Sequence, residues 1–221
     1  MKSKLIVALD VADYQDATAL IRTMRDMVDI FKVGSQLFTR VGPPIVQFLR
    51  DHGKQCFLDL KFHDIPSTVA RAVESAAALH VRMLTVHVSG GTEMLRAAAA
   101  VPNRPLLLGV TVLTSVAGEV RDDVRRLAER AKDCGLEGVV ASPREARLIR
   151  DTLGASFLIV TPGIRPAWAA AEDQERVMTP AEAVAAGADY IVLGRPIVAA
   201  TDPVRAARRV IEEITAAGGS A

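Results

Sequence analysis

The chain has 221 residues, of which 50% are hydrophobic and 24% charged, and its formal net charge is only +1. This length fits one large domain or two small ones, and the hydrophobic content suffices for a substantial core. The near-neutral balance argues against a nucleic acid or an anionic membrane surface as the main partner.

Targeting and membrane segments are not expected. The apolar stretch at the N-terminus is short and Asp10 interrupts it, so we expect no signal peptide. No apolar run approaches the roughly 20 residues of a membrane-spanning helix. Cys56 and Cys134 lie far apart without metal-like spacing, which favours a cytoplasmic protein with reduced cysteines.

Short apolar runs rich in β-branched residues recur along the chain and predict strands. In chain order they are 4–10, 30–36, 56–62, 83–88, 105–113, 138–142, 156–164 and 190–197. Most are continuously apolar rather than alternating, which is typical of parallel strands covered on both faces.

Stretches of helical period separate these runs. They predict helices at 13–28, 43–52, 66–80, 91–101, 119–134, 143–154, 180–188 and 203–217. Proline opens several of them, at Pro66, Pro143, Pro180 and Pro203, where the missing N–H is tolerated in the first turn.

Eight β–α units in one chain predict an α/β fold, a (β/α)₈ TIM barrel with a parallel eight-stranded barrel. No linker or low-complexity tract divides the chain, so we expect residues 1–221 to form a single domain. A doubly wound open sheet is the alternative. Alternation alone separates the two poorly, although eight units are more than most open sheets need.

Segment 165–178 fits neither a strand nor a helix and is longer than the usual loop between a strand and a helix. It follows the seventh predicted strand and contains the only tryptophan, Trp168. This position favours a lid over a site. The alternative is a plain surface insertion.

Charged residues recur near the ends of the predicted strands, where a barrel carries its active site. Asp59 and Lys61 are two residues apart, so we expect both side chains on one face of the strand, with Asp64 just beyond it. Lys32 lies inside another apolar strand. Such an array of alternating charges would keep a lysine charged and ready to deliver a proton.

Each of these residues also has a structural explanation. Asp64 could cap the next helix, Asp59 and Lys61 could form a purely structural ion pair, and Lys32 could extend to the rim. None of these explanations accounts for a lysine flanked by two carboxylates.

Glycine-rich turns, 161–165 and 193–196, follow the last two predicted strands. The loops after strands seven and eight are the usual phosphate site of such barrels. Arg165 and Arg195 could each add a bidentate phosphate contact, and Gln174 could close over the same group.

Other familiar sites are not indicated by the residue spacing. No His, Cys, Asp or Glu pattern suggests zinc, and no nucleophile triad, dinucleotide fingerprint or P-loop is visible. His87 ends a predicted strand, but a core histidine is the simpler interpretation.

Six motifs follow one another along the whole chain: VALD, FKVG, LDLKFHDIPST, TVLTS, TPGIR and LGRPI. In this order they resemble the motifs of the orotidine 5′-phosphate decarboxylase family. The resemblance implies a homodimeric (β/α)₈ barrel that uses neither a metal nor an organic cofactor. It also implies that the chain converts orotidine 5′-phosphate to UMP in de novo pyrimidine biosynthesis.

The resemblance implies a role for each charged residue. Lys61 matches the proton donor that protonates C6 of the carbanion, and Asp59 matches the carboxylate beside the substrate's own carboxylate. Lys32 matches the lysine that links this pair to the ribose. Asp64 matches a third carboxylate that reaches the partner's site across the dimer interface together with Thr68.

Substrate contacts are implied in the same way. Asp10 matches a ligand of a ribose hydroxyl, and either Thr114 or Ser115 makes the main contact with the pyrimidine. The implied phosphate ligands are Arg165, Gln174, Gly194 and Arg195.

Metal-dependent sugar-phosphate enzymes are the nearest rivals, among them 3-keto-L-gulonate 6-phosphate decarboxylase and hexulose phosphate synthase. They share the D-x-K-x-x-D pattern but carry a glutamate metal ligand where this chain has Lys32, and a lysine repels Mg²⁺. An isomerase or epimerase barrel would leave Lys32 and Asp64 unexplained. A non-catalytic phosphate-binding protein is the remaining alternative.

Overall fold

The strands close into a barrel in the computed structural model, which describes residues 4–113, 120–169 and 178–218. All neighbouring strands are parallel and follow the chain order. They are β1 (Lys4–Ala8), β2 (Ile30–Gly34), β3 (Gln55–Phe62), β4 (Met83–His87), β5 (Leu106–Val110), β6 (Gly138–Val140), β7 (Leu158–Thr161) and β8 (Tyr190–Leu193). Because β8 pairs with β1, the predicted barrel is confirmed and the open sheet is wrong.

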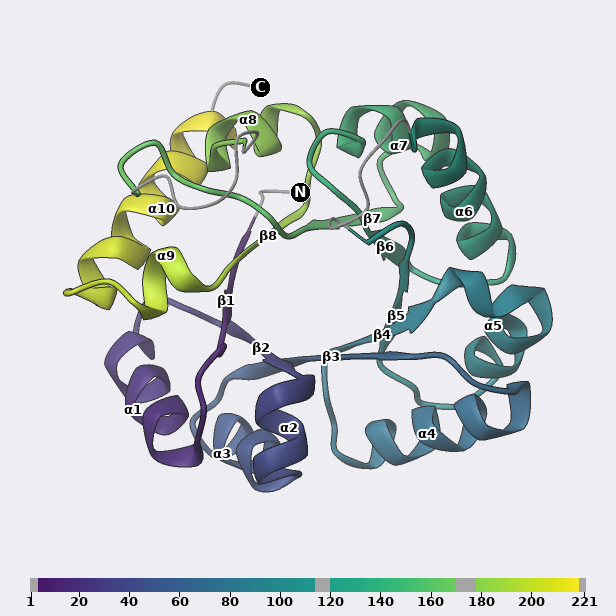
Figure 1. Cartoon of the computed structure of the whole chain (residues 1–221), viewed down its shortest axis with the longest axis horizontal. Coiled ribbons are helices and arrows are strands. Elements are labelled where there is room, and N and C mark those ends of the chain that lie inside the picture. Colours follow the sequence, from purple (N-terminus) through teal and green to yellow (C-terminus); the bar gives the residue numbers. More distant parts are fainter. Residues whose placement is uncertain (1–3, 114–119, 170–177, 219–221) are drawn as a thin grey trace.

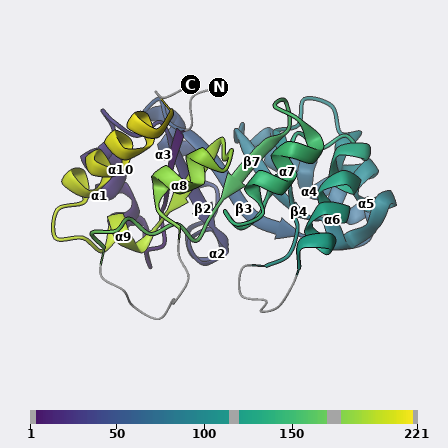
Figure 2. The ribbon, with the colours of Figure 1, turned by 90° about the horizontal axis from the view of Figure 1, so that it is seen from above.

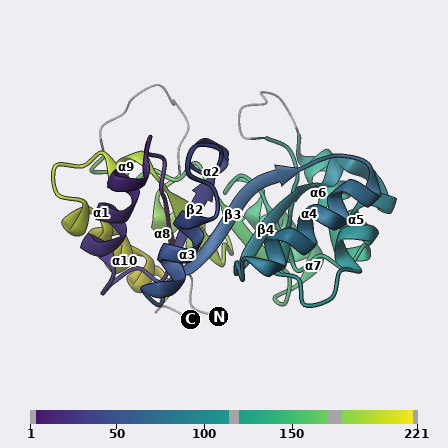
Figure 3. The same cartoon turned by 90° about the horizontal axis from the view of Figure 1, so that it is seen from below.

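Helices surround this ring on the outside (Figure 1). They are α1 (Tyr14–Met24), α2 (Ser35–Val41), α3 (Pro44–Asp51), α4 (Pro66–Ala78), α5 (Gly91–Ala99), α6 (Arg121–Asp133), α7 (Ala146–Leu153), α8 (Pro180–Ala185), α9 (Arg195–Val198) and α10 (Pro203–Gly218). Side views place α1, α9 and α10 on one flank of the barrel and α4, α5 and α6 on the other (Figures 2 and 3).

The core has two parts, because each strand buries both of its faces. Ile6, Phe57, Met83 and Leu108 belong to the cluster inside the barrel. The larger cluster fills the space between strands and helices, and in β1 it takes the residues that alternate with Ile6. Burial on both faces is the reason that these strands are continuously apolar in sequence.

Several predicted strands extend further along the chain than the observed ones. Strands β5, β7 and β8 end at Val110, Thr161 and Leu193, three or four residues before the predicted ends. The apolar composition continues past these points, but the chain leaves the sheet. After β8 it forms the short helix α9, in which Pro196 has no N–H for a strand ladder.

Two helices were not predicted, α2 and α9, and one predicted start was wrong. Helix α2 begins at Ser35, inside the predicted strand 30–36. Proline opens α4, α8 and α10 as expected, but α7 begins at Ala146 and not at Pro143, since a turn occupies the residues between.

Candidate active site

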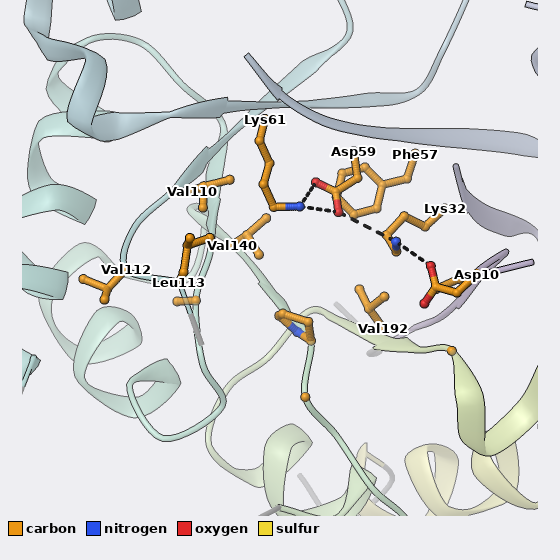
Figure 4. A pocket seen from close by; sticks show the side chains of 15 residues that line it. Asp10, Lys32, Phe57, Asp59, Lys61, Val110, Val112, Leu113, Val140 and Val192 are labelled. Carbon is orange, nitrogen blue, oxygen red and sulfur yellow. Dashed lines mark hydrogen bonds and ion pairs between the residues drawn. The ribbon is translucent and has the colours of Figure 1, made fainter. Parts of the chain in front are cut away.

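Four charged side chains form a row across the carboxyl ends of β1, β2 and β3 (Figure 4). Lys61 Nζ lies 2.8 Å and 2.9 Å from the two carboxylate oxygens of Asp59. Lys32 Nζ lies 3.8 Å from the same carboxylate and 3.2 Å from that of Asp10. The charges therefore alternate from Asp10 to Lys61 without a break.

This row forms one wall of a pocket of about 270 Å³ at the barrel mouth. The side chains of Lys32 and Asp59 are only 14% and 13% exposed, whereas that of Lys61 is 36% exposed. The Lys61 ammonium is therefore the most accessible positive charge of the row. Burial of the inner pair strengthens its electrostatic interactions.

Apolar side chains form the other wall of the pocket. Strands β5, β6 and β8 and the residues after β5 supply them, and Figure 4 shows them facing the charged row. They are Val110, Val112, Leu113, Val140 and Val192. A ligand here would lie between apolar side chains and a row of charges.

The backbone of β3 is irregular where it carries the row. Leu58 pairs with Leu84 and Phe62 with Val86, so four steps along β3 match two along β4. Lys61 lies in this bulge with a φ of +52°. Asp59 and Lys61 do point to one side, as predicted, but not because of regular strand alternation.

Thr85 lies opposite the bulge and was missed from the sequence. It is fully buried, its hydroxyl donates to Asp59 Oδ1 at 3.0 Å, and it accepts from the Lys61 backbone N–H at 2.8 Å. The available signal was a hydroxyl residue inside an apolar strand, which needs a hydrogen-bond partner when buried.

Asp64 and Thr68 do not line the pocket of their own chain. Both are exposed, and Asp64 accepts a hydrogen bond from the Ile65 backbone N–H at 2.6 Å. The N-cap of α4 is Ile65, with no side-chain cap, so the helix-capping explanation of Asp64 is wrong.

Gly194 lies at the end of the row, beside Asp10. A Cβ added at Gly194 would come within 2.6 Å of Asp10 Oδ2, so a larger residue there would displace the carboxylate. Gly163 also lines the pocket, with a φ of +75° that favours glycine.

Neither arginine of the two turns lines the pocket described here. Arg195 is the exposed first residue of α9. Arg165 is half-buried, and its backbone N–H donates to the Met178 carbonyl at 3.1 Å.

Comparisons with known proteins show the family to which the chain belongs. Residues 3–210 match the family described as orotidine 5′-phosphate decarboxylase / HUMPS. The chain belongs to this family. The resemblance inferred from the sequence motifs is therefore confirmed, and so is the expectation of an enzyme of this family.

Relatives in this family match the chain over nearly its whole length. A protein of Syntrophotalea carbinolica named orotidine 5′-phosphate decarboxylase is 52% identical, covering 98% of this chain and 96% of that protein. One of the same name from Nitrosococcus oceani is 49% identical over 97% of this chain and 98% of its own length. The crystal structure of the Lactobacillus acidophilus orotidine 5′-phosphate decarboxylase is similar at a TM-score of 0.82 and 35% identity, covering 96% of this chain and 99% of that one.

Three of the residues implied by the family resemblance, Thr114, Ser115 and Gln174, lie outside the described residues. The two ends of the predicted lid are described. Ile164 and Met178 form an isolated bridge, and the Trp168 ring lies 4.5 Å from the guanidinium carbon of Arg209 on α10. The segment therefore leaves and rejoins the barrel at one place.

His87 lies at the end of β4, and its ring centroid is 5.4 Å from that of His63. Burial, together with His63 and Lys61, lowers the pKa of His87 below its ordinary value of 6.5, although Asp59 acts in the opposite direction. A lowered pKa keeps this imidazole neutral close to the charged row.

The described part of the chain lacks two kinds of feature. Within it, no group of three or more His, Cys, Asp and Glu side chains is arranged to hold a metal ion. None of its helices is both long and apolar enough to cross a membrane.

Proposed function

We propose that the chain decarboxylates orotidine 5′-phosphate to UMP in de novo pyrimidine biosynthesis, without a cofactor. One observation carries the proposal: the alternating row from Asp10 to Lys61 lines a pocket whose other wall is apolar. Relatives that bear the name of this activity match almost the whole chain.

The chemistry requires a positive charge beside one carbon atom. When the bond from pyrimidine C6 to the carboxylate breaks, CO₂ leaves and the electron pair remains on C6 as a vinyl carbanion with no adjacent carbonyl to accept it. The Lys61 ammonium stabilises this charge and then transfers a proton to C6. The product is UMP, and Lys61 regains its proton from solvent.

Asp59 and Lys32 support this step from both sides. Asp59 lies against the substrate carboxylate, and their repulsion is relieved when CO₂ leaves. Its charge also holds the Lys61 ammonium in place at 2.8 Å. Lys32 joins Asp59 to Asp10, which binds a ribose hydroxyl, so the sugar and the reacting carbon are aligned by one chain of ion pairs.

The remaining parts of the nucleotide bind around this centre. The apolar wall suits the faces of the pyrimidine ring, with Thr114 or Ser115 at its polar edge. The phosphate is bound by Gly194, Arg195, Arg165 and Gln174. The binding energy of this remote group closes segment 165–178 as a lid and is used at the transition state.

A homodimer completes the site. Asp64 and Thr68 are exposed on either side of Ile65 and Pro66, and Ile65 is itself 63% exposed. A subunit interface at this place would bury the Ile65 side chain. Asp64 and Thr68 then enter the partner's pocket. We also infer that residues 1–221 form a single domain that acts in the cytoplasm.

The test is a spectrophotometric assay of the purified chain with orotidine 5′-phosphate, with and without excess EDTA. Substrate absorbance should fall rapidly and equally in both samples. Turnover that EDTA abolishes, or Mg²⁺-dependent activity on a keto-sugar phosphate alone, would contradict the proposal. Binding of the nucleotide without product would indicate the non-catalytic alternative.

A further inference from the structure

Thr85 is a buried residue whose hydroxyl is hydrogen-bonded to the Asp59 carboxylate and to the backbone N–H of Lys61. It is fully buried in β4 and does not line the pocket, so it cannot touch a ligand there. Its hydroxyl is nevertheless bonded to Asp59 on one side and to the Lys61 backbone on the other. A role in placing these two residues goes beyond the proposed function and rests on it.

The bulge in β3 explains why a hydroxyl is needed at this position. Between the pairs Leu58–Leu84 and Phe62–Val86, β3 has two residues more than β4. Regular strand pairing is therefore interrupted between these pairs. A backbone N–H in such a gap has to find another acceptor. The Lys61 N–H finds the Thr85 oxygen, 2.8 Å away.

The same contact holds an unfavourable backbone conformation. Lys61 has a φ of +52°, in the left-handed region that is unfavourable for a residue with a side chain. Such conformations persist when the surroundings fix them. The hydrogen bond to Thr85 fixes the Lys61 backbone, and this backbone aims the ammonium.

The Thr85 hydroxyl also makes a second hydrogen bond, in which it is the donor. Thr85 donates it to Asp59 Oδ1 at 3.0 Å, the same oxygen that lies 2.8 Å from Lys61 Nζ. One hydroxyl group therefore sets the orientation of the carboxylate and the backbone of the lysine together.

We propose that Thr85 is the positioning residue that holds the Asp59–Lys61 pair in its reactive geometry. Valine has nearly the same shape as threonine but neither donates nor accepts a hydrogen bond. Serine keeps the hydroxyl and loses only the methyl group. The two variants therefore separate the hydrogen bonds from the packing.

Steady-state kinetics of Thr85→Val and Thr85→Ser test the proposal. Thr85→Val should lower kcat about 10–100-fold and leave KM within about two-fold, because the pair is misplaced by a fraction of an ångström while the substrate contacts remain. Thr85→Ser should keep kcat within about three-fold of the parent chain. Full kcat in Thr85→Val would overturn the proposal.

Thr18→Val is the matched control. Thr18 is another buried threonine, 5% exposed, and its hydroxyl donates to the Gln15 carbonyl of the peripheral helix α1. This variant loses a buried hydroxyl that neither lines the pocket nor bonds a residue of the charged row, so its kcat should be unchanged. An equal loss of kcat in Thr18→Val and Thr85→Val would mean that any buried hydroxyl has this effect, and would overturn the proposal.

A second measurement does not depend on the substrate. Hydrogen exchange of the Lys61 amide should be slow in the parent chain and in Thr85→Ser, and at least about ten-fold faster in Thr85→Val. Equal rates in all three would overturn the proposal. If the parent chain fails to decarboxylate orotidine 5′-phosphate, the proposed function is wrong. The exchange rates then still decide whether Thr85 holds the Lys61 backbone.

Discussion

Lys61 differs from the other residues with positive φ among the described part of the chain. Of the non-glycine residues there, only Lys61, His80 and Asn103 have a φ near +55°. Asn and His enter this region more readily than most residues, and neither of those two lies at the pocket. The strained lysine, in contrast, carries the group proposed to react. Strain at a reacting residue is common in enzymes.

Replacement of Lys61 by alanine should abolish turnover while the fold is kept. The loss combines the proton donor and the charge that stabilises the carbanion, so we expect kcat to fall by at least about 10³-fold. The melting temperature should change by only a few degrees. Lys4→Ala is the control, since Lys4 is an exposed lysine at the start of β1. Normal turnover in Lys61→Ala would rule out the assigned mechanism.

His87 should make the fold sensitive to mild acid. Its pKa is lowered in the folded state, so the unfolded chain takes up the proton first as the pH falls. The neutral imidazole's contribution to stability is complete above pH 6.5 and is lost as the pH falls from 6.5 toward the lower folded pKa. The charged and titratable neighbours concerned are His63, Lys61 and Asp59.

Urea unfolding of His87→Asn at about pH 7.5 and about pH 5.5 measures this contribution. The parent chain should lose more stability between these two conditions than the variant does. The exposed His80, replaced by Asn in the same way, serves as the control. If His87→Asn and the parent chain lose equal free energy of unfolding between the two pH values, His87 is not the source of the acid sensitivity.

At the scale of single elements, the short strand β6 depends on a residue without a side chain. A Cβ at Gly138 would collide with the backbone carbonyl of Leu158 in the neighbouring strand β7. Gly138→Ala should therefore lower the free energy of unfolding by about 1–3 kcal/mol, as other overpacked cores do. Gly218→Ala is the control, because its nearest neighbour would lie 4.0 Å away. A midpoint of unfolding in Gly138→Ala equal to that of the control would show that β7 can move aside.

The turn between β8 and α9 is the element expected to bind the phosphate. Arg195 opens α9 and follows the pocket residue Gly194. Arg195→Ala should raise KM about 10–100-fold, because the loss of one hydrogen bond to a charged group weakens binding by about this factor. The effect on kcat should be smaller. Arg208→Ala, an exposed arginine on α10, should leave both constants unchanged. Inhibition by inorganic phosphate should weaken in parallel with KM, and an unchanged KM would refute the assigned contact.

At the scale of the whole molecule, the question is whether each site is shared between two subunits. The Lys61→Ala chain keeps Asp64, and the Asp64→Ala chain keeps Lys61. We expect Asp64→Ala, like Lys61→Ala, to lose most of its turnover. If Asp64 acts across a dimer interface, a mixed dimer of these two variants contains one complete site. Random exchange of subunits should then restore about a quarter of the parental activity.

Refolding the two variants together and assaying the mixture tests this. The control mixes Lys61→Ala with the double variant Lys61→Ala/Asp64→Ala, which should form no complete site and remain inactive. No recovery in the first mixture, in a preparation shown to contain mixed dimers, would place Asp64 with the lysine of its own chain.

Local patterns in the sequence determined most of the elements. Continuous apolar runs and helical periods lie close along the chain, so they predict strands and helices whatever the rest of the molecule does. The charged cluster around Asp59 and Lys61 and the glycine turns were visible for the same reason, and their order along the chain identified the family. The ends of β5, β7 and β8 could not be predicted in this way, because the apolar residues continue past the strands into the loops.

Tertiary structure alone decided how these parts meet. Closure of the barrel depends on the pairing of β1 with β8, whose residues are far apart in the sequence. The bulge in β3 depends on the register against β4, and only that register brings Thr85 to Asp59 and Lys61. The partners of a threonine in an apolar strand cannot be predicted from the residues next to it in the sequence. The reason is that hydrogen bonds between strands depend on long-range strand pairing.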